Sequence, residues 1–201
     1  MPELALVLWG VFGLVGFAGR AALQRAQTGS WGIHGVSGTA GSAEWVAGVL
    51  FIAALALGVE GPALEAADAI DPIGALDEDP VHAIGVALFA VGLIATFGAQ
   101  LAMGASWRVG VSEAERTDLV TGGPFAIVRN PIYAAMLPAI AGIVLVAPSV
   151  PAVLAWPMLL LALELQVRVV EEPHLLRTHG EAYASYAARV GRFIPAVGRI
   201  R

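Results

Sequence analysis

Four long stretches without a charged residue constrain what this chain can fold into. They cover residues 4–19, 45–59, 80–107 and 130–163. Only 13% of the 201 residues are charged and 58% are hydrophobic, whereas soluble domains carry about 25% charged residues. Too little polar surface remains to cover an exterior that faces water. The chain is therefore predicted to be an all-α integral membrane protein.

The number of transmembrane helices follows from the lengths of these stretches, because one crossing needs about 20 mostly apolar residues. As a single helix, residues 130–163 would extend about 51 Å, too far for one crossing of a core of about 30 Å. Pro148 and Pro151 would break that helix, so a helical hairpin is expected there. The five predicted spans are residues 2–23, 45–64, 80–107, 131–147 and 151–169.

The arginines test this count independently. All eleven basic residues are arginines. They fall within 20–25, 108–129 and 168–201, which share one side of a membrane crossed five times. Residues 60–79, on the opposite side, include seven acidic residues and no arginine. Because cytoplasmic loops collect Arg and Lys, the N-terminus is predicted to lie outside and the C-terminus in the cytoplasm.

Two regions are predicted. Residues 1–78 form an N-terminal two-span region with a flexible loop and an acidic loop. Residues 79–201 form the core, which ends in an amphipathic cytoplasmic helix with Tyr183, Tyr186 and Val190 on one stripe.

Zero cysteines exclude disulfides, thiolate metal sites and a cysteine nucleophile. The net charge of −5 excludes a basic face for nucleic acid, and the four histidines lack metal-ligand spacing.

Polar residues crowd the predicted cytoplasmic boundary in four places, which are residues 103–108, 119–133, 168–173 and 181–190. Each has an ordinary structural interpretation. Trp107 and Arg108 are typical of the headgroup interface. Asn130 and Pro131 suit the cap and first turn of a helix. The tyrosine stripe is typical of a helix that lies on the membrane or on the protein.

Two of these places also suit a ligand. Gly122 and Gly123 permit a tight turn with exposed amides, and a helix N-terminus beside Arg129 favours an anion. Farther along, four charged side chains are spaced to share one stripe of a helix. They are Glu164, Arg168, Glu171 and Glu172. At a membrane exit such a stripe is costly unless its members are paired or solvated.

The order of these residues forms a longer pattern between residues 100 and 195. Its parts are Gly123-Pro124-Phe125, Arg129-Asn130-Pro131-Ile132-Tyr133, Glu171-Glu172 with Leu175, Gly180-Glu181-Ala182-Tyr183-Ala184-Ser185-Tyr186, and Pro195. This pattern resembles the isoprenylcysteine carboxyl methyltransferase family, within the wider group that includes phospholipid N-methyltransferases. The first half of the chain matches that family only in hydropathy.

The resemblance implies S-adenosylmethionine as cofactor, bound on the cytoplasmic side, and carboxyl O-methylation of a hydrophobic acceptor that resides in the membrane. The implied cofactor contacts are Thr117, Leu119, Val120, Phe125, Asn130, Pro131, Ile132, Tyr133 and Glu171. The implied catalytic residues are Arg168, which would orient the acceptor, with Arg129 and Glu171.

Three departures from the family pattern stand out. Asn130 replaces the histidine common in eukaryotic members, and Phe125 replaces a frequent tyrosine. Arg168 lies three residues before Glu171 where the eukaryotic pattern has four, a difference of about 100° around a helix.

The chemistry of the cofactor suits these residues. Glu171 can hold its amine or ribose hydroxyls, Arg129 its carboxylate, and Phe125 or Tyr133 its adenine. Methyl transfer needs in-line placement and exclusion of water, but neither a metal nor a protein nucleophile. Two alternatives stay open. One is a sterol-reductase-like membrane enzyme that binds NADPH, and the other is a small non-enzymatic membrane protein.

Overall fold

The computed structural model describes residues 1–33, 35–36, 38–110 and 118–200. Its described residues form helices and loops and contain no β-strand beyond two isolated bridges. The helices are α1 (Pro2–Phe12), η1 (Gly13–Gly19), α2 (Arg20–Thr28), α3 (Ala43–Ala66), α4 (Asp79–Met103), η2 (Gly104–Ser106), η3 (Gly123–Ala126), α5 (Pro131–Val146), α6 (Val150–Leu165), η4 (Gln166–Glu171), α7 (Glu172–His179) and α8 (Glu181–Arg189). The predicted all-α architecture is confirmed.

Four continuous helices are long and apolar enough to cross a membrane. They are Pro2–Thr28, Ala43–Ala66, Asp79–Ser106 and Val150–His179. Several of their side chains are exposed although apolar, among them Leu14 at 67%, Val91 at 69% and Ile94 at 73%. Such side chains suit contact with lipid. The protein is therefore a helical membrane protein.

The fifth apolar helix, α5, is shorter, with 16 residues. It forms the first half of the predicted hairpin, and residues 147–149 separate it from α6. Pro131 occupies the first turn of α5, as predicted, but the Asn130 side chain does not cap the helix. Instead its Nδ2 donates to the Arg192 carbonyl at 3.2 Å. Asn130 therefore occupies the predicted N-cap position, but its side chain does not cap the helix because it bonds to the C-terminal segment instead.

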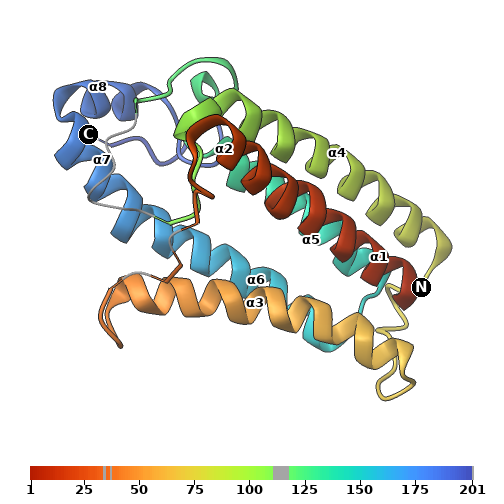
Figure 1. Ribbon diagram of the computed structural model, residues 1–201. Coiled ribbons are helices and arrows are strands. Elements are labelled where there is room, and N and C mark those ends of the chain that lie inside the picture. The colour runs from red at the N-terminus through yellow and green to blue at the C-terminus, as the bar shows by residue number, and fades with distance from the viewer. Residues whose placement is uncertain (34, 37, 111–117, 201) are drawn as a thin grey trace.

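The two ends of the bundle differ in charge. At the acidic end, the Ile73 amide donates to the Pro148 carbonyl at 2.7 Å, and the Met1 amino group lies 3.8 Å from Glu65. At the opposite end, the Val109 amide donates to the Gly32 carbonyl at 2.7 Å. The N-terminus, α7 and α8 mark these two ends in Figure 1. The arginine-bearing segments share the second end, which we call the arginine end.

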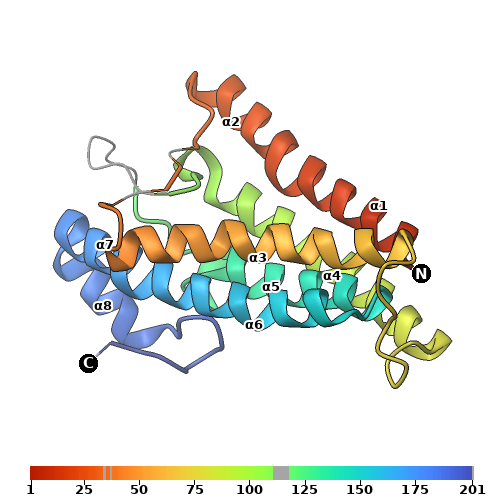
Figure 2. The same cartoon turned by 90° about the horizontal axis from the view of Figure 1, so that it is seen from below.

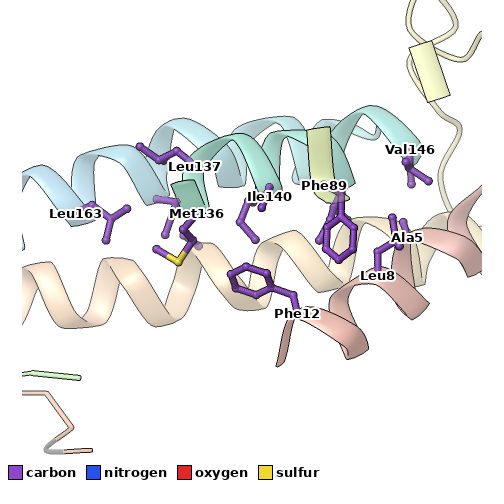
Figure 3. Packing of buried hydrophobic residues seen from close by; sticks show 14 residues of the cluster. Ala5, Leu8, Phe12, Phe89, Met136, Leu137, Ile140, Val146 and Leu163 are labelled. Atoms are coloured by element: carbon purple, nitrogen blue, oxygen red, sulfur yellow. The ribbon is translucent and has the colours of Figure 1, made fainter. Parts of the chain in front are cut away.

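The hydrophobic core surrounds α5, which packs closely against α4. A Cβ at Gly92 would lie 2.6 Å from the Ala139 amide nitrogen, so the two backbones approach to a distance that only glycine permits. Figure 3 shows Phe12, Phe89 and Ile140 meeting in this core. The helices α1–α2 and α3 converge at the acidic end and diverge towards the arginine end (Figures 1 and 2).

Candidate active site

A cavity of about 310 Å³ opens where α1–α2 and α3 diverge. This volume lies at the lower end of the range of small-molecule sites. Its walls come from residues far apart in the chain, from Phe12 in α1 to Tyr186 in α8. The cavity therefore extends from within the bundle to the loops of the arginine end.

The polar part of the cavity, which we call the cofactor end, contains the residues that the family resemblance singled out. Its lining includes Leu119, Val120, Phe125, Asn130, Pro131, Ile132, Tyr133 and Glu171. They come from the loop before α5, the first turn of α5 and the end of η4. The structure thus brings them together, and their contact with a cofactor stays a prediction. Thr117 lies outside the described residues.

Glu171 is the central carboxylate of the cofactor end. The Tyr133 hydroxyl donates to its Oε1 at 2.6 Å, and Gln166 and Arg108 also lie close to this carboxylate. Glu171 closes η4, a segment of π-helix. Such segments are rare and frequent at functional sites. A second π-helical segment, η1, also lines the cavity through Phe17.

The neighbouring carboxylate, Glu172, is held by two arginines. Arg129 Nη2 donates to its Oε1 at 2.6 Å, and Arg192 donates from Nε at 2.7 Å and from Nη2 at 2.9 Å. Arg129 also donates to the carbonyls of Ala187 at 3.0 Å and Gly198 at 3.0 Å. We call Arg129, Glu172 and Arg192 the C-terminal clamp, because they tie the last residues of the chain to the loop before α5.

The charged stripe that the spacing predicts is divided in the structure. Glu171 and Glu172 line the cavity, whereas Glu164 and Arg168 are absent from its described lining. Arg168 pairs with Glu164, and its side chain is 57% exposed. Only two members of the predicted stripe therefore reach the cavity. Between Arg168 and Glu171 the chain is π-helical (η4), and its i→i+5 hydrogen bonds change the angular spacing of a regular α-helix.

The helix α8 packs on the protein and covers the cofactor end. The Tyr186 hydroxyl donates to the Phe125 carbonyl at 2.6 Å. Burial raises the pKa of Tyr183 and of Tyr186 to about 12. The hydrogen bonds to Glu172 raise the pKa of Arg192. Both tyrosines and Arg192 therefore keep their protons at neutral pH.

Trp107, which the sequence places at the headgroup interface, is buried within the folded chain. It is 3% exposed, and the Arg20 guanidinium lies 4.6 Å from its ring centroid. Arg20 also donates to the Gly104 carbonyl, and Gln24 to that of Ala105 at 2.7 Å. Arg20, the first residue of α2, therefore covers this tryptophan with a cation–π contact, and the depth of Trp107 in the membrane stays a prediction.

Sequence reasoning missed the apolar part of the cavity, which we call the apolar arm. Its lining includes Phe12, Phe17, Ala47, Gly48, Phe51, Ile52, Met136 and Leu163. Many of these residues belong to the first half of the chain, where an apolar side chain that faces a cavity has the same sequence pattern as one that faces lipid. Thr96 and Gln100 also line this cavity, and their i, i+4 spacing within an uncharged stretch was an available signal.

The comparisons with known proteins place this site in a family. No curated protein matches the chain significantly. The sequence pattern of the phospholipid methyltransferase family matches residues 80–182, just over half of the chain. This stretch begins in α4, ends in α8 and includes Phe125, Tyr133 and Glu171. The predicted kinship with membrane methyltransferases is thus confirmed, and the chain belongs to the phospholipid methyltransferase family.

Proposed function

We propose that this protein transfers a methyl group from S-adenosylmethionine to a hydrophobic acceptor that reaches the cavity from the bilayer. One observation carries the proposal. A single cavity joins a carboxylate-bearing end, which lies within the family match, to an apolar arm formed by transmembrane helices. A polar cofactor and an apolar acceptor can therefore meet in one cavity, as methyl transfer requires.

The cofactor end has a donor set that fits S-adenosylmethionine. Glu171 can accept from ribose hydroxyls or from the ammonium group, and its bond from Tyr133 fixes the carboxylate in place. Phe125 and Ile132 offer apolar walls for the adenine. The glycine pair Gly122-Gly123 lies at the start of η3, where Gly123 has a φ of +57°. When bound, the cofactor supplies an electrophilic methyl group on a sulfonium.

The chain's own contribution to the reaction is placement. A methyl group passes from sulfur to the acceptor's nucleophilic atom, and S-adenosylhomocysteine leaves with the electron pair of the broken S–C bond. We favour carboxyl O-methylation, as the resemblance to isoprenylcysteine carboxyl methyltransferases implies, because a carboxylate needs no general base. The NADPH and non-enzymatic alternatives lose support because the family match concerns methyl transfer.

Arg129 is proposed as a positioning residue. Its Nη1 and Nη2 donate to Glu172 and to backbone carbonyls of the C-terminal segment. The Arg129 and Asn130 amides also donate to the Gly191 and Arg192 carbonyls, at 2.8 Å and 3.0 Å. These contacts hold the loop before α5 in place, so Arg129, which also lines the cavity, supports the cofactor end through the C-terminal segment.

We further propose five membrane crossings, with the N-terminus outside and the arginine end in the cytoplasm. The 16 residues of α5 span about 24 Å, which is less than a core of about 30 Å. However, most of its residues are buried among other helices. The length of α5 therefore need not match the thickness of the hydrocarbon core. The arginines at one end favour a cytoplasmic position for that end.

The topology is tested with single cysteines, since the chain has none of its own. Gly74→Cys, in the acidic loop where nothing lies near the glycine, should react with a membrane-impermeant maleimide in intact cells. The matched control Ala188→Cys, at an exposed position of α8, should react only after permeabilisation. The reverse pattern would contradict the orientation.

The reaction is tested with the purified protein, tritiated S-adenosylmethionine and a membrane lipid extract. We expect radioactivity in the lipid phase that disappears with Glu171→Ala. Mild base distinguishes the products, because a methyl ester releases volatile methanol whereas an N-methyl group stays with the lipid. If the radioactivity survives mild base, the reaction is N-methylation and not carboxyl O-methylation. Binding of NADPH without S-adenosylhomocysteine would contradict the proposal as a whole.

A further inference from the structure

Two polar side chains of α4 lie among the apolar residues of the cavity. Thr96 is 1% exposed and Gln100 is 4% exposed, and both line the cavity. They are four residues apart, so they lie on one face of the helix, one turn from each other. The apolar side chains Phe12, Phe17 and Met136 line the same cavity. We call Thr96 and Gln100 the polar pair.

The hydrogen bonds of the polar pair are incomplete within the described residues. Gln100 Nε2 donates to the Gly16 carbonyl at 2.8 Å, which fixes the orientation of the amide because a carbonyl cannot accept from Oε1. Gln100 Oε1 and Thr96 Oγ1 are buried and have no hydrogen-bond partner within the described residues. A buried polar atom without a partner is costly, so a water molecule or a ligand in the adjoining cavity is needed to supply the partner.

The chemistry of these atoms defines that partner. An amide oxygen only accepts, so Gln100 Oε1 requires an O–H or N–H group. The Thr96 hydroxyl can donate or accept. The ligand group that donates to Gln100 can therefore also accept a hydrogen bond from Thr96 or donate a second one to it. A charged group such as a phosphate would place its charge against an apolar wall and face the lone pairs of Oε1. The complementary group is neutral and carries a hydrogen.

We propose that the polar pair recognises a hydroxyl or an amide N–H of the methyl acceptor, while the acceptor's hydrocarbon part fills the apolar arm. This inference rests on the proposed function and names the class of acceptor. It is an amphiphile with a hydrocarbon part and an uncharged hydrogen-bond donor. The donor is separate from the group that receives the methyl, which lies at the cofactor end beside Glu171. The polar pair thus fixes how far along the cavity the acceptor sits, which decides whether its nucleophile reaches the methyl group.

Three probes with one hydrocarbon chain test this inference. They are farnesol, farnesyl methyl ether and farnesyl phosphate. Their binding is measured by equilibrium dialysis against the full chain in lipid nanodiscs with saturating S-adenosylhomocysteine, and is corrected for empty nanodiscs. We expect farnesol to bind about tenfold more tightly than its methyl ether, as one net hydrogen bond allows, and more tightly than the phosphate.

The decisive variant is Thr96→Val, which keeps the shape of the side chain and removes a hydroxyl that has no partner within the described residues. It should fold at least as stably as the wild type and should reduce the preference for farnesol over the ether several-fold. Gln100→Leu should abolish that preference, although it also removes the bond to Gly16. Thr39→Val, at an exposed loop position, is the matched control. It should change neither the stability nor the preference for farnesol over the ether.

Equal affinities for farnesol and its ether in the wild type would overturn the inference, and so would a preference that survives Thr96→Val. Tighter binding of farnesyl phosphate, or binding of no probe, would overturn it as well. S-adenosylhomocysteine binding is measured on the same samples. If it binds and the probes are not discriminated, only this inference fails. If it does not bind to the wild type, the proposed function fails.

Discussion

The C-terminal clamp and the polar pair are two sets of buried polar side chains that differ in how many of their hydrogen bonds are made. In the clamp, both oxygens of Glu172 accept from arginines, and Arg129 also reaches three backbone carbonyls, with only its Nε left without a partner among the described residues. In the polar pair, Gln100 Oε1 and Thr96 Oγ1 have no partner within the described chain. The clamp therefore holds the fold together, whereas the polar pair, which lines the cavity, is where we propose that a ligand supplies the missing partner.

The same difference divides Glu171 from Glu172, which are neighbours in the sequence. Glu172 is enclosed by two cations, whereas Glu171 accepts a hydrogen bond from the neutral Tyr133 hydroxyl on the cavity wall. Both carboxylates line the cavity, but the one between two arginines is neutralised by them, whereas the other keeps capacity for a ligand. We therefore expect substitutions of these two residues to affect different properties, Glu172 the stability and Glu171 the cofactor affinity.

The largest expected effect comes from breaking the clamp with Glu172→Ala. This change leaves Arg129 buried without its carboxylate, and removal of one partner of a buried ion pair costs about 3–5 kcal/mol. Thermal unfolding in detergent should show a strongly lowered Tm. The control Glu164→Ala removes the partner of the exposed Arg168 and should cost at most about 1 kcal/mol. Equal losses in the two variants would mean that the clamp does not hold the C-terminal segment.

A smaller effect is expected from Tyr133→Phe, which removes the hydroxyl bonded to Glu171. The bond is made in the free protein, so its loss should lower the Tm modestly. Because it also holds the Glu171 carboxylate in position, the Kd for S-adenosylhomocysteine should rise about tenfold. Tyr186→Phe is the matched control, because its hydroxyl donates at the same 2.6 Å distance to a backbone carbonyl. It should lower the Tm more than the affinity. A lowered Tm with unchanged affinity in Tyr133→Phe would mean that Tyr133 stabilises the fold and does not contribute to cofactor binding.

The smallest effect is expected from Arg168→Ala. Its side chain is half-exposed, pairs with Glu164 and is absent from the described lining of the cavity. We expect an unchanged Kd for S-adenosylhomocysteine, and transfer of tritiated methyl groups to the lipid extract within about twofold of the wild type, which corresponds to less than about 0.5 kcal/mol. A loss of turnover with normal cofactor affinity would instead restore the role that the family resemblance implies for Arg168, that of orienting the acceptor.

Much of the fold follows from hydropathy and proline placement. The uncharged stretches predict the helices because a helix that crosses the hydrocarbon core needs about 20 mostly apolar residues. Pro148 and Pro151 predict the break between α5 and α6. The shortness of α5 and the burial of Trp107 do not follow, because both depend on which helices surround them. Local sequence does not encode that arrangement.

The cofactor end was predictable from a spaced motif, whereas the apolar arm was not. The residues from Phe125 to Tyr133 share a loop and a helix start, so the sequence already places them together. The division between Glu171 and Arg168 depends on a π-helical segment that residue spacing cannot predict. The polar pair depends on contact between α4 and η1, which only the folded chain provides.

Calorimetric titration of the wild type and of Glu171→Gln with S-adenosylhomocysteine tests the central claim most directly, with Glu164→Gln as the control. Glu171→Gln keeps the size of the side chain and removes its charge. Micromolar binding by the wild type and Glu164→Gln, with at least a tenfold loss in Glu171→Gln, is the predicted result, since hydrogen bonds to charged groups contribute about 1.5–3 kcal/mol. Equal affinity in all three proteins, or no binding by the folded wild type, would contradict the assignment of the cofactor end.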